Sequence, residues 1–196
     1  MLRRRMQANL DLFAIHVVPS ASFATLVGLE PARIIVAPNG SDTAHVTPGP
    51  FPSQPTIGLV SGAAPGRGIE ALVDAAIELR RQVPDLQLRL WLASIDATGH
   101  AYVGAIRDKV ATQGWIEVGN APYDRLGEIL ATATVLVVPH PANAYMDVAV
   151  PVKLADSMAA GRPVVVTPRV ETARIVRAAD CGTVASGDDP DSLAAA

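Results

Sequence analysis

Short runs of β-branched residues alternate with helix-forming stretches from Thr56 to the end of the chain, and this alternation constrains the fold more than any other feature. In the first long stretch, apolar residues recur at helical spacing at Ile69, Leu72, Val73 and Ala76. Strands that alternate with helices form parallel sheets covered by helices, so we predict the α/β class. The expected strands are 56–60, 86–93, 115–119, 134–139, 162–168 and 181–185, and the expected helices are 68–82, 100–114, 125–133, 153–161, 171–180 and one from Pro190.

The first 55 residues do not follow this alternation. A strand over 13–20, a short helix over 21–26 and a strand over 33–38 make one unit that is too small to bury its own faces. The prolines of HVTPGPFPSQP are typical of a linker. We predict that residues 1–45 are the tail of a preceding domain, 46–55 a Pro-rich linker, and 56–196 an α/β domain with an incomplete C-terminal end.

Composition argues against several classes of protein. A net charge of −3 does not suit a nucleic-acid binder, which concentrates positive charge against phosphates. No run of the sequence approaches the roughly 18 apolar residues of a membrane span, and the first residues lack a signal-peptide cleavage site, so we expect a cytoplasmic protein. Cys181 is the single cysteine, which excludes an internal disulfide and suits a small core residue.

Two loops at the expected carboxyl edge of the sheet carry candidate ligand-binding residues, because ligands of open parallel sheets bind at that edge. The first loop is SGAAPGRG over 61–68, in which Gly62, Gly66 and Gly68 would let backbone N–H groups approach a ligand. Arg67 adds a permanent cation. The glycine spacing fits neither the dinucleotide nor the Walker pattern. The alternative is an ordinary glycine-rich turn with a solvated arginine.

The second loop, over 140–156, is long for a connection between a strand and a helix, and long loops are often functional. Pro151 suits the first turn of a helix. Lys153 would then sit near the positive end of the helix dipole, where a cation is repelled unless an anion shares the site. Asp156 lies on the same face, and Asp147 lies just upstream. The alternative is a solvated Lys–Asp pair on the surface.

The chain carries three motifs in order: PNGSD (38–42), the glycine loop with Arg67-Gly68, and PVKLADSMAAGRPVVVT (151–167). Together these motifs resemble the nucleotide-sugar half of the GT-B glycosyltransferases of family 4. The resemblance implies a Rossmann-like parallel sheet with helices on both faces, the C-terminal half of a GT-B fold, preceded by a remnant of the first domain. It also implies that residues 56–196 bind the sugar donor.

The resemblance implies roles for individual residues. Arg67 matches the basic residue that neutralises the donor diphosphate, Lys153 lies in the P-x-K-L element of one branch, and Asp156 falls where an acid holds the ribose. Asp147 is the nearest acid upstream for the sugar hydroxyls. We therefore expect catalytic roles for Arg67, Lys153 and Asp147, and donor binding by Gly62, Gly66, Gly68, His140 and Asp156.

The sequence also departs from the family pattern. Asp156 replaces a glutamate, Asp147 lies nine positions upstream of it where the family has eight, and Ser61-Gly62-Ala63 stands where a second cation is expected. His140 suits a structural histidine as well as a ligand of the sugar. The D-x-D spacing at Asp189 is better interpreted as a helix N-cap than as a metal site, and we expect no metal site.

The function that the resemblance implies is transfer of a sugar from a nucleoside diphosphate sugar to a sugar, lipid or small-molecule acceptor, with retention and without an essential metal. We expect no cofactor and no nucleic-acid partner. Peripheral membrane association of the full-length enzyme stays open. Two alternatives remain: a non-catalytic nucleotide-sugar-binding or assembly module, and a GT-B epimerase or phosphorylase. Because the acceptor surface belongs to the preceding domain, we expect this chain alone to bind donor without turnover.

Overall fold

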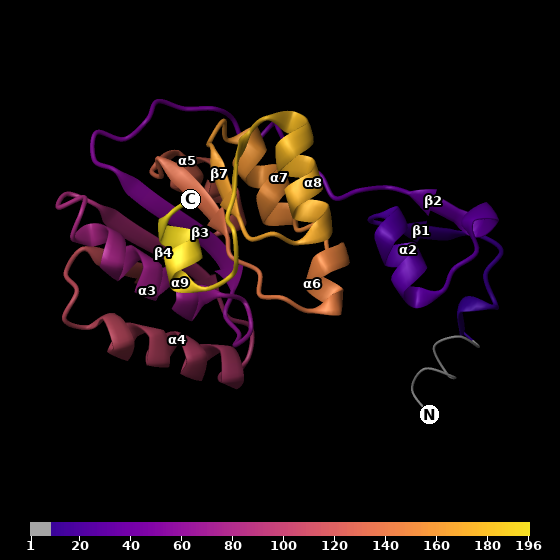
Figure 1. The fold of residues 1–196 in the computed structure, drawn as a ribbon, viewed down its shortest axis with the longest axis horizontal. Coiled ribbons are helices and arrows are strands. Elements are labelled where there is room, and N and C mark those ends of the chain that lie inside the picture. Colours follow the sequence, from indigo (N-terminus) through magenta and orange to yellow (C-terminus); the bar gives the residue numbers. More distant parts are fainter. Residues whose placement is uncertain (1–8) are drawn as a thin grey trace.

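The computed structural model describes residues 9–196 and contains a six-stranded, fully parallel sheet in the order β5-β4-β3-β6-β7-β8 (Figure 1). From β3 the chain adds β4 and then β5 on one side, and it then adds β6, β7 and β8 in turn on the other side of β3. This is the Rossmann strand order, and it confirms the predicted α/β class. The strands are β3 (Thr56–Gly62), β4 (Gln87–Ala93), β5 (Ile116–Gly119), β6 (Val135–Val138), β7 (Val164–Val166) and β8 (Gly182–Val184).

Helices cover both faces of the sheet, and each face has its own apolar core. The first core includes Leu72, Ile106 and Leu193, and the second includes Leu130 and Leu154. Apolar surface buried on both faces explains the nearly continuous apolar strands of the sequence. The first face is covered by α3 (Ile69–Arg80), α4 (Ala97–Val110) and α9 (Pro190–Ala194), and the second by α5 (Leu126–Ala131), α7 (Val152–Ala159) and α8 (Val170–Ala179).

Most helix boundaries differ from the predicted ones by a few residues, and the reasons are local. The helix α4 begins at Ala97, three residues before the predicted start, because the Asp96 carboxylate accepts a hydrogen bond from the Gly99 N–H at 2.8 Å. Pro151 is the N-cap of α7 and not its first residue. Asp189 caps α9 as predicted, accepting from the Ser192 N–H at 2.9 Å.

A short helix, α6 (Ala144–Val148), lies inside the long 140–156 loop, where the sequence predicted irregular structure. The Asn143 side chain caps it by accepting a hydrogen bond from the Met146 N–H at 2.9 Å. Five residues are too few to show helical periodicity, which explains why the pattern did not reveal it. The described residues also contain the 3-10 turns η1 (Pro31–Arg33) and η2 (Tyr123–Arg125).

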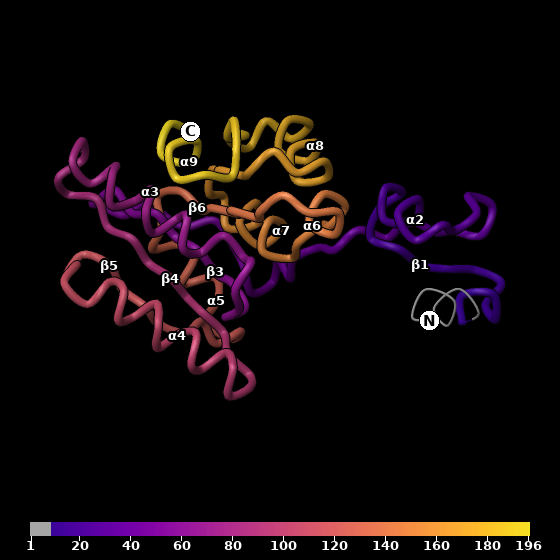
Figure 2. Tube along the Cα trace, turned by 60° about the horizontal axis from the view of Figure 1, so that its bottom comes forward, coloured from indigo at the N-terminus to yellow at the C-terminus, as the bar shows by residue number. Residues whose placement is uncertain are grey.

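The N-terminal unit lies beyond α6 at one end of the molecule in both views (Figures 1 and 2). Its strands β1 (His16–Val18) and β2 (Ile34–Val36) pair in parallel and flank α2 (Ala21–Val27), and both are shorter than the predicted strands. They do not join the large sheet. Val17 and Ile35 are 68% and 55% exposed, as expected of a unit that cannot bury its own faces. The predicted domain boundaries stay predictions.

A buried arginine holds the proline-rich segment against the sheet domain. Arg162 is 2% exposed, and its Nη2 lies 3.1, 2.6 and 3.0 Å from the carbonyl oxygens of Gly49, Pro50 and Ala131. Its guanidinium carbon lies 4.4 Å from the centre of the Phe51 ring. We call Arg162 and these three carbonyls the linker clamp. The linker therefore lies against the domain along this part of its length.

The structure also bears on the single cysteine and on the question of membrane-spanning helices. Cys181 is a free thiol, partly buried against the second core, and burial raises its pKa. Within residues 9–196, none of the helices has the length and apolar character needed to cross a membrane.

Candidate functional site

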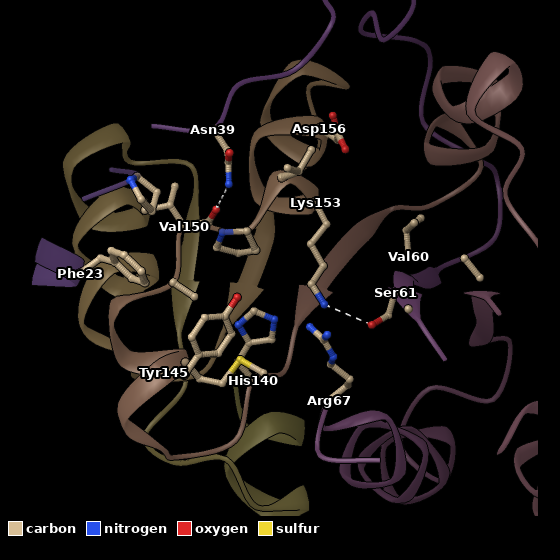
Figure 3. A pocket seen from close by; sticks show the side chains of 17 residues that line it. Phe23, Asn39, Val60, Ser61, Arg67, His140, Tyr145, Val150, Lys153 and Asp156 are labelled. Carbon is tan, nitrogen blue, oxygen red and sulfur yellow. Dashed lines mark hydrogen bonds between the residues drawn. The ribbon is translucent and has the colours of Figure 1, made fainter. Parts of the chain in front are cut away.

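A cavity of about 470 Å³ opens at the carboxyl ends of β3 and β6 (Figure 3). These two strands are the neighbours at which the strand order reverses, and parallel sheets bind their ligands at that point. The N-terminal unit supplies Pro19, Phe23 and Asn39 to its wall. The side chains with polar groups that line it from the sheet domain are Ser61, Arg67, His140, Tyr145, Lys153 and Asp156.

The glycine loop orients Arg67 toward this cavity. Gly66 and Gly68 have left-handed backbone conformations, with φ of +74° and +76°. A Cβ on Gly68 would lie 1.7 Å from the carbonyl oxygen of Pro139, so the start of α3 packs directly on the end of β6. Gly62 lines the cavity, whereas the other two glycines shape the turn and do not line it. Their predicted contact with the donor stays a prediction.

Lys153 enters the cavity from the first turn of α7. Its Nζ donates a hydrogen bond to the Ser61 Oγ at 3.3 Å, and it pairs with no carboxylate among the described residues. Burial lowers the pKa of Lys153 to about 8, and the charge of Arg67 contributes to this lowering. Two cations thus face one cavity at the positive end of a helix. We call Arg67 and Lys153 the cation pair, and an anion placed between them would remove their repulsion.

His140 lies beside the cation pair in Figure 3 and is 2% exposed. Its carbonyl oxygen accepts a hydrogen bond from Thr167 Oγ1 at 2.6 Å, while neither ring nitrogen has a partner among the described residues. Burial lowers the pKa of His140 to about 3, with contributions from the charges of Lys153, Arg67 and Arg169. The imidazole is therefore neutral at physiological pH, and it can offer a ligand one donor and one acceptor.

Asp156 lines the cavity on the next turn of α7, and in Figure 3 its carboxylate lies away from His140. Burial raises the pKa of this carboxyl, and the nearby Ser41 hydroxyl offsets part of the rise. Ser41 belongs to the PNGSD segment, whose Asn39 donates a hydrogen bond to the carbonyl of Val150 at 2.5 Å. This segment, found in the sequence as a family motif, thus forms part of the cavity wall.

Asp147 does not line the cavity. It lies on α6 and accepts a hydrogen bond at 3.2 Å from Nη1 of Arg169, a residue that is 8% exposed. The carboxylate thus neutralises a buried arginine instead of facing the cavity. Its predicted catalytic role stays a prediction. Over residues 9–196, no group of three or more His, Cys, Asp or Glu side chains is arranged to hold a metal ion.

Sequence reasoning missed three residues at or beside this site: Phe23, Tyr145 and Arg169. Phe23 carried no signal, since it lies in the N-terminal unit far from the loops in sequence. Tyr145 lies in the long loop that follows the predicted strand 134–139, and its position just after the end of that strand was a signal that could have identified it. Arg169 follows β7 and supports α6 through Asp147.

Comparison with known proteins gives a family match over residues 54–196, to the family described as "Glycosyl transferases group 1". Among curated proteins, the chain is 27% identical over 114 residues to a phosphatidylinositol N-acetylglucosaminyltransferase subunit from Arabidopsis thaliana. That alignment covers 56% of this chain and 25% of the relative.

Solved structures share the fold. HepE from Anabaena, in complex with UDP and glucose, superposes with a TM-score of 0.77 at 16% identity, over 100% of this chain and 56% of that one. The sucrose-phosphate synthase from Thermosynechococcus elongatus gives 0.72 at 17% identity, over 92% of this chain and 47% of that one. The chain therefore spans about a quarter of the curated relative and about half of these two structures.

Proposed function

Since the chain belongs to the group 1 family of glycosyl transferases, we propose that its sheet-edge cavity binds a nucleoside diphosphate sugar as the donor for sugar transfer. The observation that carries the proposal is the cation pair, because Arg67 and Lys153 face one cavity and neither pairs with a carboxylate among the described residues. A diphosphate supplies the missing negative charge. HepE, which has the same fold, was solved with UDP and glucose.

The cation pair also suits the chemistry of the transfer step. When the bond between the anomeric carbon and the diphosphate breaks, negative charge grows on the diphosphate oxygens. Arg67 and Lys153 would stabilise that charge in a partly buried site, where electrostatic interactions are stronger than in water. Asp156 would hold the ribose hydroxyls, with the backbone of Gly62 beside the nucleotide. We further propose retention at the anomeric carbon and no requirement for a metal, as the family resemblance implies.

The acceptor side of the reaction is a separate proposal. Since the chain spans about half of the two solved structures, the acceptor site would lie mainly in residues that precede the sheet domain. A sugar, a lipid or a small molecule would serve as acceptor in the cytoplasm, with peripheral membrane association for a lipid acceptor. This chain alone would bind donor and leave it intact.

A thermal shift assay with UDP, GDP and ADP tests donor binding. At about 100 times its dissociation constant, a ligand stabilises the folded state by roughly 2.7 kcal/mol, which raises the Tm of a chain of this size by about 5–11 °C. We expect that shift with one of the three nucleotides, and a much smaller one with the matching nucleoside, which lacks the diphosphate. Absence of a shift with all three would overturn the proposal.

A non-catalytic module is the second candidate, and two observations favour it. Ser61-Gly62-Ala63 provides no second cation after β3, and Asp147 is held by Arg169 outside the cavity. Such a module would bind the nucleotide sugar without breaking it, even when the complete protein is supplied. An assay for nucleotide release by the full-length protein separates the two, since only a transferase releases the diphosphate faster when an acceptor is added.

A further inference from the structure

The two ends of the cavity differ in the side chains that they present to a ligand. At one end, β3 and β4 finish at the paired residues Gly62 and Ala93, whose side chains are no larger than a methyl group. At the other end, Phe23 and Tyr145 present aromatic rings. In Figure 3 the cation pair lies between Ser61 on one side and Tyr145 on the other. A diphosphate at the cation pair would thus extend toward two chemically different ends.

The aromatic end is assembled from two parts of the chain that are far apart in sequence. Phe23 lies on α2 of the N-terminal unit, and Tyr145 lies on α6 of the sheet domain. The Ser20 Oγ donates a hydrogen bond to the Val148 carbonyl at 3.1 Å, which holds α2 against α6. Tyr145 remains 58% exposed although it lines the cavity. Its ring is therefore available to a ligand.

His140 supplies the buried hydrogen-bonding group of this end. Both of its ring nitrogens are buried and without a partner among the described residues, and unmade hydrogen bonds of buried groups are costly. A hydroxyl both donates and accepts, and so matches a neutral imidazole. Of the residues that line the cavity, Asp156 is the one acid, and its carboxylate lies away from His140 in Figure 3.

We propose that Phe23, Tyr145 and His140 form the subsite for the transferred sugar, and that this subsite takes an uncharged hexose. The C–H face of the hexose packs on the two rings, whose faces carry partial negative charge, and one hydroxyl bonds to His140. At the opposite end, the small residues Gly62 and Ala93 leave room for the flat base of the nucleotide. This inference rests on the proposed function, since the diphosphate at the cation pair sets the position of the sugar.

Calorimetric titration of the full chain tests the subsite. The dissociation constants of UDP, GDP and ADP are measured beside those of UDP-glucose, GDP-mannose and ADP-glucose. For each base, the ratio of the diphosphate Kd to the sugar-nucleotide Kd reports what the sugar adds to binding. The variants are Tyr145→Ala, which removes the ring, and Tyr145→Phe, which keeps it. Tyr123→Ala is the control, because Tyr123 is 62% exposed and does not line the cavity.

In the wild type we expect a ratio above one for the base that binds. Tyr145→Ala lowers that ratio about two- to ten-fold and leaves the Kd of the plain diphosphate unchanged, as suits the loss of one aromatic contact. Tyr145→Phe and Tyr123→Ala keep the wild-type ratio. Because Tyr145 is mostly exposed, its truncation removes little packing, and an unchanged Tm checks that each variant folds.

Three results would overturn the proposed subsite, and a fourth would overturn the proposed function as well. A wild-type ratio of one or less, or a Tyr145→Ala variant in which both Kd values are unchanged, means that the rings do not hold the sugar. An equal weakening of the plain diphosphate and its sugar derivative by Tyr145→Ala means that the rings stack on the base instead. If no nucleoside diphosphate binds at all, the proposed function fails together with the subsite.

Discussion

The linker clamp and the cation pair both place arginine or lysine side chains in partly or fully buried surroundings, but these side chains have different partners. Arg162 reaches three backbone carbonyls and the face of Phe51. Lys153 reaches a single hydroxyl and stands near a second cation, Arg67. Breaking the contacts of a buried polar group is costly, whereas removing a buried charge that has few partners need not be.

This difference indicates that Arg162 has a structural role, whereas Arg67 and Lys153 have a role in ligand binding. The clamp makes its three hydrogen bonds within the protein, all through Nη2 of Arg162, while Nε and Nη1 have no partner among the described residues. Its loss should therefore affect folding and leave nucleotide binding intact. The cation pair is incomplete without an anion, so its loss should affect binding and leave folding intact. Each prediction below tests one side of this contrast.

The largest effect is expected for Arg162→Met. Methionine fills much of the same volume but leaves the carbonyls of Gly49, Pro50 and Ala131 without their donor, and unmade buried hydrogen bonds are costly. We expect a loss of about 3 kcal/mol in the free energy of unfolding and a Tm lower by about 6–12 °C. Urea unfolding measures the first and a thermal melt the second, with Arg177→Met as the exposed control. A Tm within about one degree of the wild type would refute the structural role.

Lys153→Ala should act on binding. A charge-assisted hydrogen bond contributes about 1.5–3 kcal/mol, so its loss weakens nucleoside diphosphate binding by about 10- to 100-fold in a calorimetric titration. The Tm of the ligand-free protein should not fall, because the substitution removes a poorly solvated charge. Lys109→Ala, at a surface pair with Asp74, serves as the control. Normal binding by Lys153→Ala would show that Lys153 is no part of an anion site.

The pH dependence of the ligand-free protein should carry the signature of Lys153. Its pKa is about 8 in the folded chain, against 10.5 for an unperturbed lysine, so between these values the unfolded chain binds more protons. Stability relative to Lys153→Ala therefore rises with pH from about 8 to 10.5, whereas diphosphate binding weakens over the same window as the cation is lost. Urea unfolding and titration across this range measure both trends. Parallel trends would contradict the assignment of the charge.

The smallest effect concerns Phe51. Its ring is 59% exposed and its centre lies 4.4 Å from the guanidinium carbon of Arg162, so Phe51→Ala should cost about 0.5–1 kcal/mol in urea unfolding. A double-mutant cycle with Arg162→Met separates that contact from the general loss of apolar surface. Full additivity of the two substitutions would show that the ring and the guanidinium do not interact.

The two cation sites also show what the sequence can and cannot predict. The alternation after Thr56 predicts the sheet, and Lys153 is recognised because proline and the helix dipole make its position unusual. Arg162 stands in GRP at the start of an expected strand, where nothing marks it as buried. Its partners are backbone carbonyls of residues 31 to 113 positions away. Every residue has a backbone carbonyl, so the sequence does not show which ones an arginine will contact. Asp147 looked available because its partner, Arg169, lies 22 positions further on.

The linker clamp also has a mechanical consequence. The chain is anchored from His45 onward: Gly127 approaches the His45 carbonyl closely, Val46 is 1% exposed in the second core, and Arg162 donates hydrogen bonds to the carbonyls that follow. The proline-rich segment is therefore fixed to the sheet domain. Because the Ser20 bond to the Val148 carbonyl also ties α2 to α6, the N-terminal unit is attached through both its helix and the linker. The Asn39 bond to the Val150 carbonyl adds a third attachment, and this one lies in the wall of the cavity, so the same contacts that join the N-terminal unit to the sheet domain also shape the binding site.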